Sequence, residues 1–417
     1  MVDSMRDERA RPEAIGQGRH RVDSRQRTWA ARGRGPRLSR RVVVGLVLSV
    51  VLVGVFFAAK LWRVGGSEFD YSGAGGHDLV IQVRPGDSTT AVGEALQAHG
   101  VIKTVRVFVE AARGNAAIAA IQPGFYRMRT EIPAADAVAR LADPKTRVGR
   151  LVIPEGTQLD DTTDMKTGKV NPGVFALIAK ASCVNLDGNR RCVSVDDLRN
   201  SAGSGTPADL AVPGWALPAV TAMGADHRRI EGLIAPGAFD VDPGSSAQQM
   251  LGTLIGASAD IYANSGLSDP GADGGSRPGL SPYDVLVVAS LVQREVKPDD
   301  FPRVARVIYN RLAQHHSLEF DSTVNYPLDR REVATSDADR AQRTPWNTYL
   351  LAGLPATPIS SPSVDALRAA AHPEPGDWLY FVTIDKDGTT LFTRDYKQHL
   401  VNVELAKRNG FLDSLPR

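Results

Sequence analysis

The stretch that decides the fold is "SPYDVLVVASLVQREVKPDD", residues 281–300. Ser281 suits the N-cap of a helix, because its hydroxyl can accept a hydrogen bond from a free backbone N–H of the first turn. Pro298 marks the other end, because the residue before a proline avoids the helical conformation. We therefore predict one short helix between these two residues.

One residue does not fit the apolar face of this helix. At 100° per residue, its valines and alanine fall on one arc, and Glu295 projects into that arc between Val288 and Leu291. A carboxylate held there loses hydration, which raises its pKa and keeps a proton available near neutral pH. A general acid needs that property. The alternative is that Glu295 reaches water at the rim or pairs with an arginine.

The composition indicates a folded protein of two or three domains. The chain has 417 residues, of which 42% are hydrophobic and 23% are charged. Its eight histidines and two cysteines do not occur at the spacings that are typical of metal ligands, so no metal or other cofactor is expected. Cys183 and Cys192 are nine positions apart, and outside the cytoplasm such a pair can close a small disulfide loop.

The N-terminal region predicts a membrane anchor. Residues 1–41 hold twelve arginines and five acids, a net charge of +7 against +2 for the whole chain. The next eighteen residues, 42–59, carry no charge and are longer than the apolar core of a typical cleaved signal. We expect a single transmembrane helix over 42–62, a cytoplasmic N-terminus and an extracytoplasmic remainder. This position argues against nucleic acid as the target of the basic tail, so the expected partner is the inner membrane.

The rest of the chain reads as α+β. Residues 63–77 form a linker, and 78–147 form a small β-α-α-β unit followed by a further helix. Residues 148–417 begin with a strand, a turn and the start of a helix, and include a loop-rich insertion at about 170–228. Helices are then expected from about Ser246, over 281–298, near 304–311 and at the C-terminus, with a hairpin over 378–394.

Several motifs occur in a fixed order in the C-terminal part. They are "ASLVQRE" (289–295), "VARVIYNRL" (304–312), "LEFDSTVNY" (318–326), "NTYLLAGLPATPISSPSVDALRAAAHP" (347–373) and "WLYFV" (378–382). They resemble the "ASIVEKE", "VAxVFxNRL", "LQxDPTVxY", "NTYxxxGLPPGPIxNPGxxALxAAxxP" and "YLYFV" segments of the MltG (YceG-like) family of membrane-anchored endolytic murein transglycosylases. Upstream, "VIPEGTQLDD" and "IEGLIAPGAF" are similar to the family's "IPEGxTxxx" and "LEGYLFPDTY", and 78–147 resembles its small LysM-like domain.

The chain departs from the family pattern at a few positions. Gln293 replaces the first acid of "EKE", whereas Glu295 keeps the second, which is the catalytic one in the family. In the segment similar to "LQxDP", Asp321 matches but Glu319 and Ser322 do not. The 170–228 insertion matches no family segment.

The resemblance implies a reaction that needs one carboxyl group. Glu295 would protonate the oxygen of the MurNAc–GlcNAc bond and then take a proton from the C6 hydroxyl of MurNAc, which attacks C1 and leaves a 1,6-anhydro end. Most glycosidases need two carboxyl groups, but a nucleophile within the substrate already has a high effective concentration.

The remaining candidates are assigned secondary roles. Asp321 would orient Glu295 or the sugar, or cap a turn; Asn347 and Tyr349 would bind glycan, or hold a hydrogen-bonded turn. Arg311 lies on a buried helical face, so it needs a carboxylate or carbonyl partner, and a buried acid is preferred. Trp346 and Trp378 are expected in the core rather than on sugars.

Two other functions stay open. One is a non-catalytic peptidoglycan-binding scaffold that works through the LysM-like domain. The other is an inverting muramidase with Asp321 or Glu319 as base. In each case the partner is the peptidoglycan glycan strand, and the resemblance also implies association with peptidoglycan synthases of elongation or division.

Overall fold

The structure is a computed structural model that describes residues 49–55, 68–113, 115, 118, 121–267, 280–331 and 335–410. Of the predicted tail (1–41) and anchor (42–62), only 49–55 are described, and they are helical. Among the residues that the structure describes, no helix has both the length and the apolar character to cross a membrane. The anchor and its orientation therefore stay predictions.

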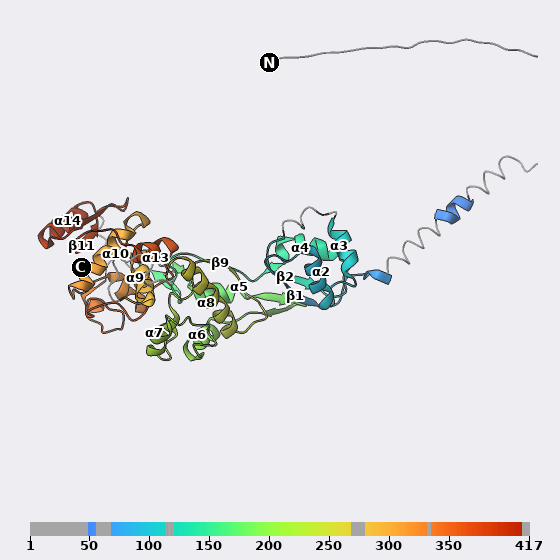
Figure 1. The fold of residues 1–417 in the computed structure, drawn as a ribbon, viewed down its shortest axis with the longest axis horizontal. Coiled ribbons are helices and arrows are strands. Elements are labelled where there is room, and N and C mark those ends of the chain that lie inside the picture. The colour runs from blue at the N-terminus through green and yellow to red at the C-terminus, as the bar shows by residue number, and fades with distance from the viewer. Residues whose placement is uncertain are drawn as a thin grey trace, which may run out of the picture. The chain divides into compact units, whose positions relative to one another are not determined.

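Residues 78–148 form a small unit with its own hydrophobic core (Figure 1). Its elements are β1 (Asp78–Val83), α2 (Thr89–Ala98), α3 (Val105–Arg113), β2 (Gly124–Arg129), α4 (Ala134–Ala142), η2 (Pro144–Thr146) and β3 (Arg147–Val148). β2 lies between β1 and β3 and pairs antiparallel with both. Leu96, Phe108 and Met128 are fully buried between this sheet and the helices. The predicted β-α-α-β order with a further helix is therefore present.

The middle of the chain, 150–267, is more regular than the sequence indicated. Its elements are β4 (Arg150–Ile153), β5 (Thr162–Asp164), β6 (Val170–Asn171), α5 (Val174–Ala181), β7 (Val184–Leu186), β8 (Asn189–Arg191), α6 (Val195–Ser204), α7 (Leu217–Ala222), η3 (His227–Ile230), β9 (Gly237–Asp240) and α8 (Ala247–Asn264). β4 pairs antiparallel with β9, and α6 packs on both α5 and α8. The helix beginning near Ser246 is confirmed, with Ser246 as its N-cap.

Two predictions for this region were wrong. No helix follows β4 directly. The chain turns at Gly156, whose φ of +68° is left-handed, and then continues to β5. The 170–228 segment is not loop-rich, because it holds α5, α6 and α7. Phe175, Ile178 and Leu198 of these helices are fully buried, so packing forms helices that the Gly/Ser/Pro-rich composition concealed.

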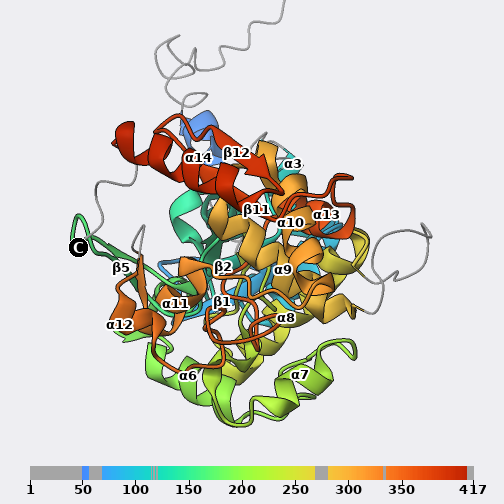
Figure 2. The same cartoon turned by 90° about the vertical axis from the view of Figure 1, so that its left-hand side faces the viewer.

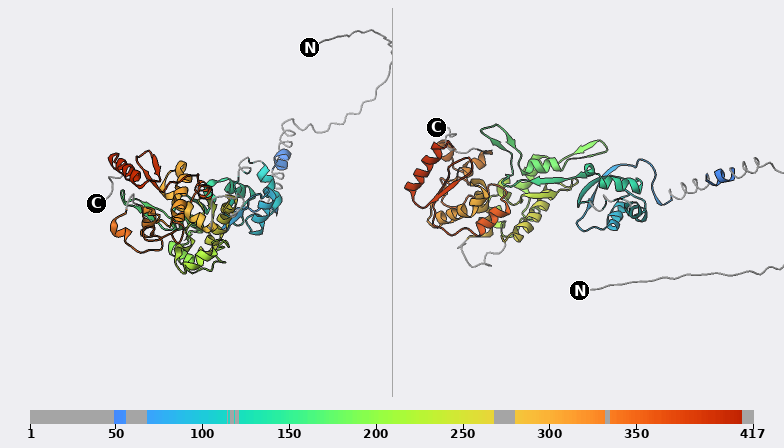
Figure 3. Two further views of the ribbon diagram at one scale, coloured as in Figure 1. Left: turned by 60° about the vertical axis from the view of Figure 1, so that its left-hand side comes forward. Right: turned by 90° about the horizontal axis from the view of Figure 1, so that it is seen from above.

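The described residues from 280 to 410 complete the C-terminal part (Figure 2). Its elements are α9 (Pro282–Glu295), η4 (Pro298–Asp300), α10 (Phe301–Ala313), α11 (Asp321–Asn325), η5 (Tyr326–Leu328), β10 (Arg330–Arg331), α12 (Asp337–Arg340), α13 (Val364–Ala371), β11 (Tyr380–Thr383), β12 (Thr390–Thr393) and α14 (Tyr396–Arg408). α9, α10 and α13 pack against one another, and α14 packs on the β11–β12 hairpin (Figure 3). The observed mixture of helices and small sheets confirms an α+β fold.

The α9 helix has the predicted ends but not the predicted environment. Ser281 and Asp284 form a reciprocal capping box, and Val296 after the helix is extended. Every residue from Val285 to Val292 is buried, so the helix is covered on all sides rather than along one arc. The residues of the opposite side pack as well; Leu286, for example, is fully buried. Glu295 is therefore the last residue of a central helix, at the point where α9 leaves the core.

One glycine allows two of the sequence motifs, "IEGLIAPGAF" and the segment 347–373, to pack closely together. Gly232, in "IEGLIAPGAF", has a φ of +74°, and a Cβ atom there would lie 2.6 Å from the Cβ of Pro358. Only glycine relieves both the backbone strain and the clash. The two segments can therefore approach closely beside α9, where Ile359 donates its backbone N–H to Ser290 Oγ at 3.0 Å.

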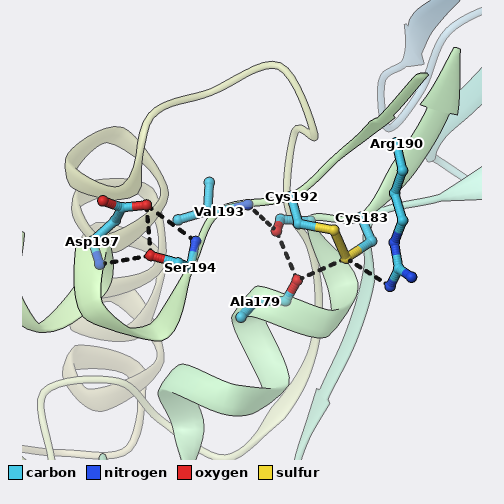
Figure 4. Close-up of a disulfide and its surroundings, with 8 residues drawn as sticks. Ala179, Cys183, Arg190, Cys192, Val193, Ser194 and Asp197 are labelled. Atoms are coloured by element: carbon cyan, nitrogen blue, oxygen red, sulfur yellow. Dashed lines mark hydrogen bonds between the residues drawn. A yellow bond between two sulfur atoms is a disulfide. The ribbon is translucent and has the colours of Figure 1, made fainter.

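The two cysteines form a disulfide at the base of the β7–β8 hairpin (Figure 4). Cys183 and Cys192 are bonded with a Cα–Cα distance of 4.2 Å. The hairpin turns at Asp187 and Gly188, which both have positive φ. Ser182 Oγ accepts the backbone N–H of Val193 at 3.0 Å, which holds the two ends of the hairpin together beside the disulfide.

Candidate active site

The C-terminal end of α9 positions three polar side chains in succession. Gln293 Oε1 accepts the backbone N–H of Ser363, the N-cap of α13, at 2.9 Å. Arg294 Nη1 donates to the carbonyl of Gly156 at 3.3 Å. The amide oxygen of Gln293 accepts the N–H of Ser363 as a carboxylate oxygen would, so Gln293 in place of the family's acid keeps an acceptor at this position. Glu295 follows, with its side chain only partly exposed.

Glu295 has the environment of an acid that retains its proton near neutral pH. Burial raises its pKa to about 7, opposed by the hydrogen bond that Ser322 Oγ donates to its Oε1. The negative charge of Asp321 raises the pKa further, and the nearby guanidinium groups of Arg294 and Arg311 lower it. The residue as a whole is partly exposed, so Glu295 lies at the margin of the core and not sealed inside it.

Asp321 begins α11 and is held by side chains from three other segments. Its carboxylate accepts hydrogen bonds from Thr335 Oγ1 and from Tyr349 Oη, the latter at 2.9 Å. Arg340 pairs with the same carboxylate at 3.1 Å, and its guanidinium lies over the Tyr349 ring, 5.0 Å from the centroid. These contacts fix an anion beside Glu295. Burial and the Asp321 charge also raise the pKa of Tyr349, which keeps it a neutral donor.

Asn347 stabilises the segment that carries Arg340 and Tyr349. It is almost fully buried, and its Nδ2 donates to the carbonyls of Arg340 at 2.9 Å and Gln342 at 2.7 Å. Its Oδ1 accepts the backbone N–H of Tyr349 at 3.0 Å. Both amide hydrogens are thus used within the protein. This geometry favours the hydrogen-bonded turn over direct glycan binding and connects the residues that hold Asp321.

Arg311 stabilises the loop before α11 through carbonyl groups. Its Nε donates to the carbonyl of Leu379 at 2.7 Å, and its Nη1 donates to that of Leu318 at 2.5 Å. The hydrogen bonds of Arg311 go to backbone oxygens and not to the preferred partner, a buried acid, although its charge also acts on the carboxyl of Glu295. They tie α10 to the hairpin and to the segment that leads into Asp321.

The two tryptophans contact the protein rather than an open surface. Trp346 is 5% exposed, donates its Nε1–H to Thr357 Oγ1 at 2.7 Å, and packs edge-on against Tyr326. Trp378 is partly buried, with its ring centroid 5.8 Å from that of Phe392. These contacts favour a role in packing, and not in sugar binding, for both residues.

Several residues near Glu295 were missed in the sequence. Ser322 was noted only as a mismatch, and Thr335 and Arg340 lie in a polar stretch without a recognisable pattern. For Arg340, the one available signal is its place seven residues before Asn347, where the "NTYLLAGLPATPISSPSVDALRAAAHP" motif begins.

A second buried acid, Glu231, was also missed. It is 1% exposed, and its Oε2 accepts the hydroxyl of Tyr326 at 2.8 Å and the backbone N–H of Leu159 at 3.1 Å. Burial raises its pKa to about 7. Because Tyr326 directly follows α11, this contact anchors the far end of the short helix that carries Asp321 and Ser322. The signal for it was a lone acid among apolar residues in "IEGLIAPGAF".

The chain is similar to proteins of one family over most of its length. The profile of the YceG-like family matches residues 81–405. A Bacillus subtilis (strain 168) protein named endolytic murein transglycosylase is 24% identical over 322 residues, which cover 76% of this chain and 82% of that protein. A protein of the same name from Streptococcus pneumoniae (strain R6) is 23% identical over 340 residues, or 78% of this chain and 58% of that protein. A YceG-like protein from Listeria monocytogenes, of known crystal structure, is 22% identical with a TM-score of 0.47, covering 78% of this chain and 98% of that chain.

Proposed function

The chain belongs to the YceG-like family, as its motifs predicted, and we propose that it is an endolytic peptidoglycan lytic transglycosylase with Glu295 as its acid and base. The relatives named endolytic murein transglycosylase support the peptidoglycan-cleaving activity. The observation that carries the role of Glu295 is its environment: a desolvated carboxyl on a partly exposed residue, beside a fixed anion.

The first step would be protonation of the leaving group. With a pKa of about 7, a substantial fraction of Glu295 holds its proton at neutral pH. Transfer of that proton to the oxygen between MurNAc and GlcNAc lets the C1–O bond break, and the GlcNAc side departs as an alcohol. Positive charge develops at C1 of MurNAc as the bond breaks.

The second step would return the proton to Glu295. The C6 hydroxyl of MurNAc attacks C1 and gives its proton to the Glu295 carboxylate, which restores the starting acid. The products are a 1,6-anhydroMurNAc end and a free GlcNAc hydroxyl, and no water is consumed. One carboxyl group can serve in both steps because the nucleophile is part of the substrate.

Asp321 would act through its charge. Thr335, Arg340 and Tyr349 hold its carboxylate in a fixed position, so the anion needs no reorganisation as positive charge develops on the sugar. The same charge raises the pKa of Glu295. The inverting alternative would instead use Asp321 or Glu319 to activate water, and it predicts hydrolysed ends.

Digestion of purified peptidoglycan by the full-length protein in detergent tests this function. Wild type should release fragments that carry 1,6-anhydroMurNAc inside the original strands, detected by mass spectrometry, and Glu295→Gln should release almost none. Glu404→Gln is a matched control, because Glu404 is exposed on α14 and, among the residues that the structure describes, forms an ion pair with Lys407 alone. Equal activity of folded Glu295→Gln would remove the enzymatic role from this residue, and glycan binding without cleavage by wild type would favour the scaffold alternative.

The proposal extends to location and partners. The uncharged run over 42–59 and the arginines before it support a single-pass anchor in the cell membrane, with the N-terminus cytoplasmic and the catalytic part outside. Such an enzyme would act beside the peptidoglycan synthases of elongation or division.

A role in glycan binding is proposed for the LysM-like unit as well. It has a cavity of about 470 Å³ lined by the turn between β1 and α2, by Phe108 of α3 and by Pro123. None of the residues that line the cavity belongs to the Glu295 site, so the cavity would hold a strand rather than react with it.

A further inference from the structure

We infer that Ser322 is a positioning residue that sets the orientation and the proton affinity of Glu295. This inference rests on the proposed function, because it gives Ser322 a role through the acid of that reaction. Ser322 stands where the family pattern "LQxDPTVxY" has proline, so the hydroxyl is a feature of this chain and not of the pattern.

The contact itself is direct. Ser322 Oγ donates a hydrogen bond to Glu295 Oε1, which joins the second residue of α11 to the last residue of α9. Proline has no group that can donate this bond. A carboxyl at the end of a helix, with no such partner, can turn among several side-chain rotamers. The hydroxyl selects the one in which Oε1 faces Ser322 of α11.

The backbone does not explain the serine. Ser322 lies in the first turn of α11, where backbone N–H groups have no helical partner, and within the described residues its N–H makes no backbone hydrogen bond. Proline is well tolerated in this turn. Replacing the family's proline by serine therefore gains nothing for the helix, and the hydroxyl's one described partner is the Glu295 carboxyl.

The position of α11 is fixed from both ends, so the hydroxyl is held in place. At the start of the helix, Asp321 is held by Thr335, Arg340 and Tyr349. After its end, Tyr326 donates to the buried Glu231. A side chain on so constrained a helix can impose its geometry on Glu295 instead of following it.

Other groups around Glu295 also act on its proton affinity. Asp321 of α11 disfavours ionisation, whereas Arg294 of α9 and Arg311 of α10 favour it, and Tyr349 is a neutral neighbour. On α13, which also packs on α9, Asp365 and Arg368 pair with each other at the surface. Ser322 differs from all of these because it touches the carboxyl and favours the ionised form, which accepts the bond more strongly.

The test compares Ser322→Ala with wild type in the full-length protein in detergent. Loss of the hydroxyl should move the basic limb of the kcat/KM–pH profile upward by about one pH unit, because a hydrogen bond to a charged group contributes about that much. Below the limb, loss of orientation should reduce kcat/KM several-fold. Ser322→Thr should restore both, since it keeps a hydroxyl. Ser281→Ala is the matched control: Ser281 donates the same kind of bond to a carboxylate, that of Asp284, at the opposite end of α9, so its limb should not move.

A second readout does not depend on turnover. A ¹³C NMR titration of labelled glutamate carboxyls, with Glu295 assigned by its loss in Glu295→Gln, should show a higher midpoint for Glu295 in Ser322→Ala. An unchanged midpoint and limb in folded Ser322→Ala would overturn the role of Ser322 while leaving the transglycosylase proposal intact. An inactive wild type would overturn that proposal instead, and the titration would still decide the role of Ser322.

Discussion

Replacing Glu295 by glutamine should stabilise the protein, and the gain should grow as the pH rises from about 4.5 through about 7. The pKa of Glu295 is about 7 in the folded protein against an ordinary value of 4.5. Between these values the folded state binds more protons than the unfolded state, so the free energy of unfolding falls as pH rises through this window. Glutamine has no such titration, and its side-chain oxygen can still accept the bond from Ser322.

The size of the effect follows from the pKa difference. A shift of this size corresponds to at most about 3 kcal/mol at 1.36 kcal/mol per pKa unit, and partial exposure of the side chain reduces this to ~1–2 kcal/mol. The variant and wild type should therefore unfold at nearly the same temperature at pH 5, while at pH 8.5 the variant should unfold a few degrees higher.

Thermal unfolding followed by circular dichroism at both pH values measures this difference. The other buried acid, Glu231, also has a pKa of about 7, but it is present in both proteins, so its contribution cancels. A difference that is the same at pH 5 and pH 8.5, or a variant less stable at pH 8.5, would refute the reasoning that Glu295 is held against its ionisation.

Further predictions concern activity, the disulfide and topology. Glu295→Gln should lower turnover at least ~10²-fold, and wild-type activity should decline as pH rises above about 7, when the acid loses its proton; a rate that keeps rising to pH 9 would contradict this. Asp321→Asn should lower turnover less and move the basic limb to lower pH, because the charge that raises the pKa of Glu295 is gone; an upward shift in the profile would oppose the assignment. Replacing Cys183 and Cys192 by serine should cost ~2 kcal/mol in chemical denaturation, and free thiols in protein purified from the envelope would show that the bond does not form there. Protease added outside spheroplasts should digest the catalytic part and leave a small N-terminal remnant, whereas a soluble chain starting near residue 60 would indicate a cleaved signal.

The parts of the fold that depend on local signals could be predicted. The ends of α9 follow from Ser281, Asp284 and Pro298, and the start of α8 from Ser246. Each of these signals acts within one turn of helix, so a single sequence displays it. The α5 and α6 helices were missed, because their stability comes from buried residues such as Phe175 and Leu198 and not from their Gly/Ser-rich composition.

Glu295, Asp321 and Tyr349 of the candidate site could be named from the sequence, but the contacts among them could not. Glu295 could be found because it interrupts an apolar helix inside a motif. The bond from Ser322 joins residues 27 positions apart, and the contacts to Asp321 come from residues 14 to 28 positions later. No local pattern encodes such distances, so the positions of Thr335, Arg340 and Tyr349 around the carboxylate required the structure. For the same reason Asn347 was grouped with glycan-binding residues, although its amide is used internally.

The central claim is that one carboxyl, Glu295, cleaves the glycan with a nucleophile taken from the substrate. The most direct measurement is digestion of purified glycan strands in ¹⁸O-labelled water, with mass spectrometry of the new MurNAc ends. Wild type should produce 1,6-anhydroMurNAc ends that lack the label. Reducing MurNAc ends that carry ¹⁸O would contradict the claim, because they require an activated water and hence a second carboxylate acting as base.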